Sequence, residues 1–250
     1  MAEAKVRLYV DQPLAAGQPV SVGADQANYL FNVMRLVRGD AVSLFNGRDG
    51  EWRAVVEQAG KRAGGLLCEA MSGPQGVPPD LWLLFAPIKK LRTDFIVEKA
   101  VELGVARILP VQTRFTNADR IRQDRLQAHA VEAAEQCGAT YVPEVAELAG
   151  LERVLSGWGA RRLLWCDEGL ARRASVLSGL FAGPRASGLR STEPWAILIG
   201  PEGGFSADEQ ARLRAMPQVV PLSLGPRILR ADTAAVAAMT LWQAALGDWG

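Results

Sequence analysis

The feature that most constrains the fold is an alternation of short apolar runs with amphipathic segments, which begins near residue 80 and continues toward the end of the chain. Runs typical of buried strands lie at residues 81–86, 107–111, 162–166, 195–199 and 219–224. Helices are expected over residues 94–103 and 124–136, and from Ala207 and about Thr233 onward. Strands that are apolar along their whole length must be covered on both faces, which indicates a parallel sheet between layers of helices. This part of the chain is therefore predicted to be an α/β domain.

The chain before residue 73 has a different pattern. Short segments rich in β-branched and aromatic residues occur at residues 7–10, 19–22, 41–45 and 52–56, and one helix is expected over residues 25–33. They predict a small β-barrel. Residues 73–79 hold two glycines and three prolines, which exclude a helix and a central strand. We therefore expect a barrel domain at residues 1–72, a linker at residues 73–79 and the α/β domain at residues 80–250.

The cysteines and the N-terminus indicate the compartment. Cys68, Cys137 and Cys166 are odd in number and include no Cys-x-x-Cys pair, so neither a disulfide framework nor a zinc site is favoured, and no metal is expected. The N-terminus lacks a signal-peptide pattern, and no apolar run approaches the roughly 20 residues of a membrane span. We expect a protein of the reducing cytoplasm with no membrane partner.

The charge balance limits how this chain can meet nucleic acid. It has 28 Lys and Arg against 27 Asp and Glu, for a net charge of +1, and residues 1–72 hold eight basic and eight acidic side chains. The whole-molecule field that drives indiscriminate phosphate binding is therefore missing. A nucleic-acid partner must be held by a few local groups.

The loop after the run at residues 195–199 is rich in glycine. Gly200, Gly203 and Gly204 permit close backbone approach to a ligand, and Ser206 with Glu209 predicts a capping box that starts the next helix. Ligands of open α/β sheets bind beyond the carboxyl ends of strands, where this loop is expected. The spacing is neither the Gly-x-Gly-x-x-Gly of dinucleotide sites nor a Walker loop. A tight strand-to-helix turn is an equally open interpretation of the loop taken alone.

The loop after residues 219–224 contains Gly225, Pro226 and two arginines, Arg227 and Arg230. Asp232 or Thr233 is expected to cap the following helix. Arginines beside a helix start are not favoured by the helix dipole. That conflict favours a functional role for Arg230 over a simple surface charge.

Four segments, at residues 95–116, 132–143, 197–209 and 222–234, together resemble the bacterial 16S ribosomal RNA uridine N3-methyltransferases of the SPOUT class. They occur in the same order, and residues 1–72 are similar to the PUA-like barrel of that family. Two departures stand out. The segment expected to read Gln-Ser-Gly-Arg ends here in Cys137, Gly138 and Ala139, which removes an arginine that could contact RNA, and Asp232 replaces an expected Glu with the charge kept.

The resemblance implies a SPOUT-type parallel sheet with a C-terminal trefoil knot, a homodimer, and S-adenosylmethionine as cofactor. The partner would be 16S rRNA or the small ribosomal subunit, and the enzyme would methylate N3 of one uridine. Carried onto this chain, the cofactor-binding residues are Leu198, Ile199, Gly200, Pro201, Glu202, Gly203, Gly204, Leu222, Ser223, Leu224, Gly225, Arg227, Ile228 and Leu229.

Methyl transfer to N3 requires that its proton leave, and an arginine beside a uracil carbonyl would stabilise the resulting anion. Arg230 is the expected catalytic residue, with Glu202 or Asp232 orienting it or accepting the proton through water. The expected RNA-binding residues are Arg35, Arg38, Lys89, Arg92 and Arg114.

Two other functions remain open at this point. The chain could be a related SPOUT enzyme that acts on another base or on a ribose, or a non-catalytic rRNA-binding assembly factor. A nucleophilic triad would depend entirely on His129, the only histidine, which is interpreted as an ordinary helix residue.

Overall fold

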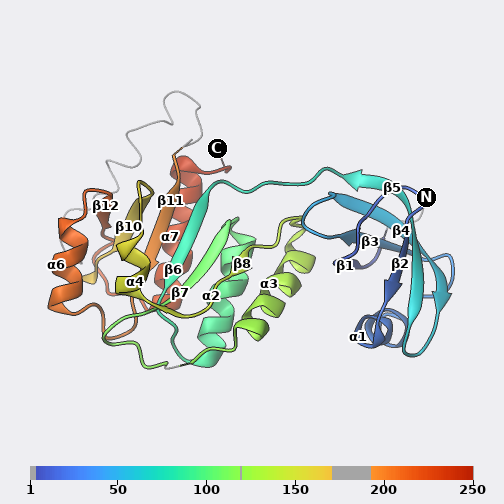
Figure 1. Ribbon diagram of the computed structural model, residues 1–250, viewed down its shortest axis with the longest axis horizontal. Coiled ribbons are helices and arrows are strands. Elements are labelled where there is room, and N and C mark those ends of the chain that lie inside the picture. Colours follow the sequence, from blue (N-terminus) through green and yellow to red (C-terminus); the bar gives the residue numbers. More distant parts are fainter. Residues whose placement is uncertain (1–3, 119, 171–192, 250) are drawn as a thin grey trace. The chain divides into compact units, whose positions relative to one another are not determined.

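The computed structural model describes residues 4–118, 120–170 and 193–249 of the chain (Figure 1). These residues form two compact units. The first unit comprises residues 1–77 with 134–142, and the second comprises residues 78–133 and 143–250. Among the described residues, no helix combines the length and apolar character needed to cross a membrane.

The first unit is built on a five-stranded sheet in the order β1-β3-β4-β5-β2. Its strands are β1 (Arg7–Tyr9), β2 (Pro19–Val22), β3 (Ala41–Phe45), β4 (Glu51–Ala59) and β5 (Gly64–Gly73). β1 pairs with β3 in parallel and the other pairs are antiparallel. The four predicted strand segments are confirmed. β5 was not predicted, because it contains three glycines and no β-branched residue and so has a low strand propensity. Its extended conformation is stabilised by backbone pairing with β4.

The helix expected over residues 25–33 is a short α-helix, α1 (Ala24–Ala27), that continues as a π-helix, η1 (Asn28–Val33). Ala27 and Leu30 are fully buried in the core of the first unit. The helix was therefore expected in the right place, but it turns as a π-helix and its last residue, Val33, is 61% exposed, which a 3.6-residue period does not describe.

Arg7 in β1 is half-buried and binds the last residues of helix α3 (Gln123–Cys137). These last residues of the helix, from Ala134 onward, belong to the first unit. The Arg7 Nε donates to Glu51 Oε2 at 2.7 Å, and Nη1 donates to the carbonyl oxygen of Ala134 at 2.6 Å. The same guanidinium lies 4.6 Å from the centroid of the buried Phe45 ring. A cation that donates hydrogen bonds to the unpaired carbonyl oxygens at a helix C-terminus is stabilising.

The second unit is a parallel sheet in the order β12-β10-β11-β6-β7-β8, with β9 paired to β7. Its strands are β6 (Leu81–Phe85), β7 (Arg107–Gln112), β8 (Glu144–Val145), β9 (Ala149–Gly150), β10 (Arg162–Cys166), β11 (Trp195–Ile199) and β12 (Val219–Leu222). Among the described residues, its helices besides α3 are α2 (Lys90–Glu102), α4 (Leu151–Ser156), α6 (Ala207–Ala215), α7 (Ala231–Leu246) and the 3₁₀ turn Glu168–Leu170. The predicted parallel α/β sheet is confirmed.

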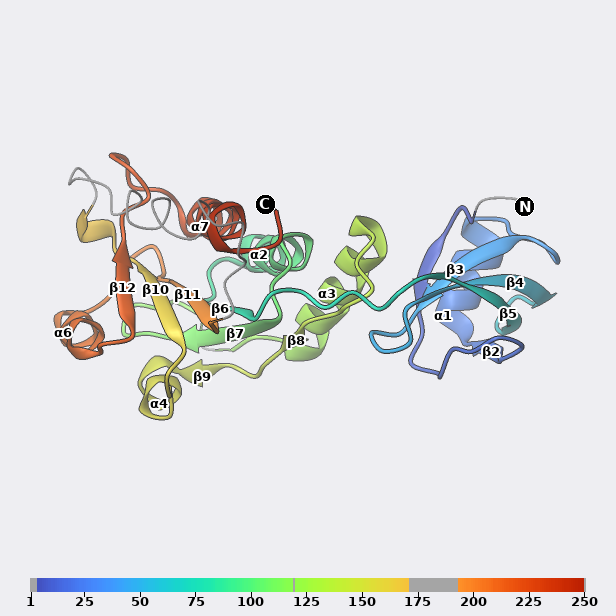
Figure 2. The same cartoon turned by 90° about the horizontal axis from the view of Figure 1, so that it is seen from above.

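Helices cover both faces of this sheet. Figure 2 shows α2 and α7 on one face and α4 and α6 on the other. Leu83, Leu84, Ile197 and Leu198 in the central strands are fully buried, which explains why these runs are apolar throughout. The two-residue strands β8 and β9 and the short α4 were not predicted, because segments of this length have no period to detect.

The two helix starts expected from sequence differ in outcome. The capping box at Ser206 and Glu209 is confirmed. The expected cap of α7 by Asp232 or Thr233 is wrong, because the helix begins at Ala231 and no side chain caps it. The Asp232 carboxylate instead accepts from the Thr233 amide and pairs with Arg92.

The trefoil knot implied by the resemblance stays a prediction, because part of the chain between β10 and β11 lies outside the described residues.

Replacement of Arg7 by Met removes one partner of the half-buried pair with Glu51. We expect the free energy of unfolding to fall by about 2 kcal/mol, measured by urea titration at pH 7. Arg48→Met is the matched control, because Arg48 is 54% exposed and lies 3.6 Å from Asp11. Equal effects of the two substitutions would contradict the anchoring role of Arg7.

Candidate functional site

A cavity lies where the carboxyl ends of β10, β11 and β12 meet. Because β10 pairs with both β11 and β12, the loops that follow these three strands leave the same edge of the sheet. The cavity has a volume of about 890 Å³, counted with its open mouth. It is lined by Cys166, Asp167, Glu168, Ile199, Gly200, Pro201, Glu202, Gly204, Phe205, Leu222, Leu224, Gly225, Arg227, Ile228, Leu229, Arg230, Ala231 and Ala234.

The glycine loop after β11 is closely packed. A Cβ atom on Gly200 would come within 2.7 Å of the Phe205 ring. Gly204 has a φ of +67°, and its Cβ would collide with the Glu168 carboxylate. The Gly204 amide also donates to the Pro201 carbonyl oxygen at 2.9 Å. The loop is therefore both a tight strand-to-helix turn and a wall of the cavity, so the two interpretations left open by the sequence describe one structure.

The loop after β12 provides the opposite part of the lining. Gly225 turns it with a φ of +107°, a conformation that favours glycine. The side chains of Leu222, Leu224 and Leu229 give this part of the cavity an apolar character. Apolar walls with a few convergent polar groups are typical of small-molecule sites.

Most of the residues expected to bind a cofactor line this cavity, and three do not. Leu198 is fully buried in the core of the second unit. Gly203 is exposed and faces Phe115, which a Cβ atom would approach to 3.0 Å. Ser223 is buried, and its hydroxyl donates to the Leu170 carbonyl oxygen at 3.3 Å.

Several residues that line the cavity were not predicted from the sequence. They are Cys166, Asp167, Glu168, Phe205, Ala231 and Ala234. The first three end or follow a strand that was predicted correctly, so the signal was present in the sequence. What was lacking was the strand order, which puts the end of β10 between those of β11 and β12.

The charges of the cavity are divided between its loops. Asp167 is buried, and its carboxylate accepts from the Gly169 amide at 2.9 Å and lies 3.4 Å from Arg214. Glu168 and Glu202 are exposed and add two further carboxylates. The cationic groups, Arg227 and Arg230, come from the loop after β12 and are likewise exposed.

The three residues expected to act in catalysis are placed differently. Arg230 and Glu202 both line the cavity. Asp232 is not among the lining residues, and its carboxylate lies 3.1 Å from the Arg92 guanidinium. This ion pair connects the first turn of α7 to the first turn of α2, directly after Arg230.

The basic residues expected to bind RNA in the second unit have distinct surroundings. Arg92 is paired with Asp232, as described above, whereas Lys89 is exposed at the start of α2. Arg114 is exposed, and its backbone amide donates to Glu209 Oε1 at 2.8 Å. Since Glu209 also closes the capping box of α6, this bond connects the loop after β7 to the loop that follows β11.

In the first unit, Arg35 and Arg38 lie in the exposed segment that follows η1. Arg35 has a φ of +57°, in the left-handed region that residues other than glycine rarely adopt. Val33 and Val37 beside them are each 61% exposed. Exposed apolar side chains thus lie near both cations, whereas Leu36 between them is buried in the core.

The remaining titratable groups have structural surroundings. His129 accepts from Arg125 Nε at 3.3 Å, and Arg125 in turn pairs with the buried Asp94, so the histidine belongs to an ionic cluster between α2 and α3. Burial raises the pKa of the Cys166 thiol to about 12. Within the described ranges, no group of three or more His, Cys, Asp and Glu side chains is arranged to hold a metal ion.

Known protein families match both parts of this chain. The family described as RNA methyltransferase domain matches residues 76–243, and the family described as RNA methyltransferase PUA domain matches residues 22–63. Ribosomal RNA small subunit methyltransferase E of Synechocystis is 31% identical over 88% of this chain and 71% of its own length. The protein of the same name from Rickettsia conorii is 29% identical over 93% of both chains.

Two solved structures share the fold over nearly the whole chain. A putative methyltransferase from Legionella pneumophila, in complex with S-adenosylmethionine, has a TM-score of 0.84 and 28% identity, covering 99% of this chain and 100% of its own. Ribosomal RNA small subunit methyltransferase E from Neisseria gonorrhoeae, bound to S-adenosylmethionine, has a TM-score of 0.81 and 25% identity, covering 98% and 99%.

The high pKa of the Cys166 thiol predicts low reactivity even though the residue lines the cavity. At pH 8 its thiolate fraction is about one in ten thousand, so we expect iodoacetamide to alkylate it more than about a hundredfold more slowly than the exposed Cys137. Peptide mass mapping of a labelling time course measures both rates. Comparable rates at the two positions would refute the expectation.

Proposed function

The chain belongs to the RNA methyltransferase family that includes ribosomal RNA small subunit methyltransferase E, and from that premise we propose that it methylates N3 of one uridine in 16S rRNA with S-adenosylmethionine as methyl donor. The observation that carries the proposal is the cavity at the ends of β10, β11 and β12, with an apolar lining and two exposed arginines. Its loops contain the segments at residues 197–209 and 222–234 that resemble the family.

The residues of the cavity fit the proposed cofactor. Gly200 and Gly204 pack directly against the Phe205 ring and the Glu168 carboxylate, with no room for a Cβ atom, so the loop lines the site with its backbone. Leu222, Leu224 and Leu229 offer apolar contacts to an adenine ring. When bound, S-adenosylmethionine supplies an electrophilic methyl group on a sulfonium.

Arg230 is proposed as the catalytic residue. Its guanidinium is exposed at the cavity, where it can lie beside a uracil carbonyl and stabilise the anion that forms as the N3 proton leaves. Glu202 lines the same cavity and is the proposed acceptor of that proton, directly or through water. Asp232 is proposed as a positioning residue, since its pair with Arg92 anchors the first turn of α7 immediately after Arg230.

RNA contacts are proposed in each of the two units. Lys89 and Arg114 are exposed in the second unit, and Arg114 lies on a loop bonded to the start of α6. In the first unit, Arg35 and Arg38 can meet phosphates while Val33 and Val37 meet bases, because single-stranded RNA presents both. Arg92 is a weaker candidate, because its charge is already paired with Asp232.

A homodimer is proposed from the family resemblance. Since the proposed substrate is ribosomal RNA, we propose that the protein acts in the cytoplasm.

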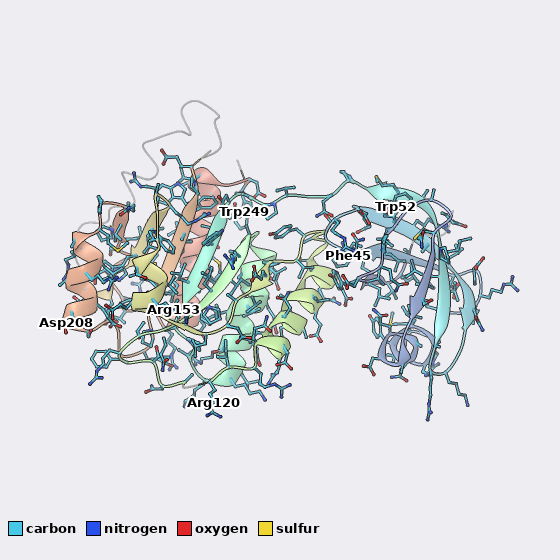
Figure 3. All side chains as sticks on the ribbon, in the orientation of Figure 1. Phe45, Trp52, Arg120, Arg153, Asp208 and Trp249 are labelled. Carbon is cyan, nitrogen blue, oxygen red and sulfur yellow. The ribbon has the colours of Figure 1, made fainter. Side chains whose placement is uncertain are left out.

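Replacement of Arg230 by Ala tests the catalytic assignment. We expect turnover on small-subunit rRNA to fall by at least about a hundredfold, as removal of one charge-stabilising group typically does. Calorimetric affinity for S-adenosylmethionine should stay within about threefold of the wild type. The control is Arg153→Ala, an exposed arginine on α4 that does not line the cavity (Figure 3). Near-normal methylation by the Arg230 variant would refute the assignment.

The substrate is tested in cells with and without the protein, by mass mapping of small-subunit rRNA. We expect the loss of one methyl group from one uridine in the deleted strain, restored by the wild-type gene and not by the Arg230→Ala variant. An unchanged map would reject this substrate, and a lost methyl on a ribose or on another base would identify a different acceptor.

A further inference from the structure

One carboxylate of the cavity has no role in the function proposed so far. Glu168 follows β10 on the 3₁₀ turn Glu168–Leu170, and its side chain lies against Gly204 of the glycine loop. The space that it occupies exists because Gly204 has no side chain. Two loops from different strands are thus shaped so that this carboxylate lies in the lining of the cavity.

The other two carboxylates of the cavity, Asp167 and Glu202, already have partners or a proposed role. Asp167 is buried and is held by the Gly169 amide and by Arg214. Glu202 is the proton acceptor of the proposed function. Glu168 is exposed, and within the described part of the chain it forms no ion pair. Its charge is therefore available to a ligand.

The arginines of the cavity come from a different loop, so the lining has carboxylates after β10 and β11 and arginines after β12. Arg227 and Arg230 belong to the loop after β12, whereas Asp167 and Glu168 follow β10. The proposed reaction has a matching polarity, because its cofactor carries a positive sulfonium and its acceptor becomes an anion. A carboxylate from one loop and an arginine from another can favour both charges.

S-adenosylmethionine and its product S-adenosylhomocysteine differ by one methyl group and one positive charge on sulfur. Their adenine, ribose, ammonium and carboxylate groups are the same, so contacts to those groups stabilise both molecules equally. Only a group that interacts with the charge on sulfur, or with the methyl itself, can distinguish the methyl donor from the spent product.

We propose that Glu168 is a specificity-determining residue that favours the charged methyl donor over the neutral thioether product through its carboxylate in the cavity lining. The inference rests on the proposed function. It assigns a different role to each charged part of the site: Glu168 retains the donor and helps the product to leave, and Arg230 acts on the RNA base.

Calorimetry on the full chain, with each ligand separately, tests this role without relying on activity. In Glu168→Gln, we expect the Kd for S-adenosylmethionine to rise about fivefold, since an exposed charge pair contributes roughly 1 kcal/mol. The Kd for S-adenosylhomocysteine should change less than about twofold, because that ligand has lost the sulfur charge. Sinefungin, which carries a cationic amine near the position of the methyl group, should follow S-adenosylmethionine.

Asp208→Asn is the matched control. It removes one negative charge from α6 without altering the cavity lining, and Figure 3 labels this exposed residue. We expect it to change none of the three affinities. If it lowered the affinity for the charged ligands as much as Glu168→Gln does, the effect would come from net charge and the inference would be overturned.

Two further outcomes would also overturn it. Equal weakening of both cofactor forms would show that Glu168 contacts the shared ammonium or ribose, and unchanged affinities would show that it contacts neither ligand. Failure of the proposed function looks different: the wild-type protein would bind neither S-adenosylmethionine nor S-adenosylhomocysteine if the methyl donor were wrong, and the rRNA map would change elsewhere or not at all if the acceptor were wrong.

Discussion

The lateral pairing of β10 between β11 and β12 is the interaction on which the rest of the structure depends. It is maintained by parallel backbone ladders and by a core in which Leu163, Leu164 and Trp165 are buried. The Phe205 ring, from the loop after β11, meets the Trp165 ring edge-on at 5.9 Å. This contact fixes the glycine loop against the strand whose end provides Asp167 and Glu168. The cavity is thus a direct consequence of strand order and not of any single motif.

Because the total charge of the chain is close to zero, only individual charged groups, and not the molecule as a whole, can attract RNA. At +1, the molecule has no field that would gather RNA indiscriminately, and its cations are used one at a time. Some hold the fold, as Arg7 does with Glu51 and the end of α3. Others, among them Arg227 and Arg230, stay exposed at the cavity. A modifying enzyme that acts on one nucleotide can depend on shape and a few placed charges.

Prediction from sequence worked wherever a segment was long and strongly patterned. The five apolar runs of the second unit and the capping box at Ser206 and Glu209 occur where they were expected. It failed where neighbours override local preference. β5 is ordered by its ladder to β4, η1 widens into a π-helix over the buried Leu30, and Asp232 pairs with Arg92 in place of capping α7. In each case a tertiary contact decides the conformation.

The class of fold, the two loops of the site and the family of the chain were all predictable from the sequence, because periodicity, glycine spacing and ordered motifs are local properties. Which residues share the cavity was not predictable in this way and depends on the arrangement of the strands. The tertiary structure excluded Leu198, Gly203 and Ser223 from the lining and brought in Cys166, Asp167 and Glu168. The physical reason is that a parallel sheet orders its strands by crossover connections and burial, so residues far apart along the chain meet at one edge that no local pattern encodes.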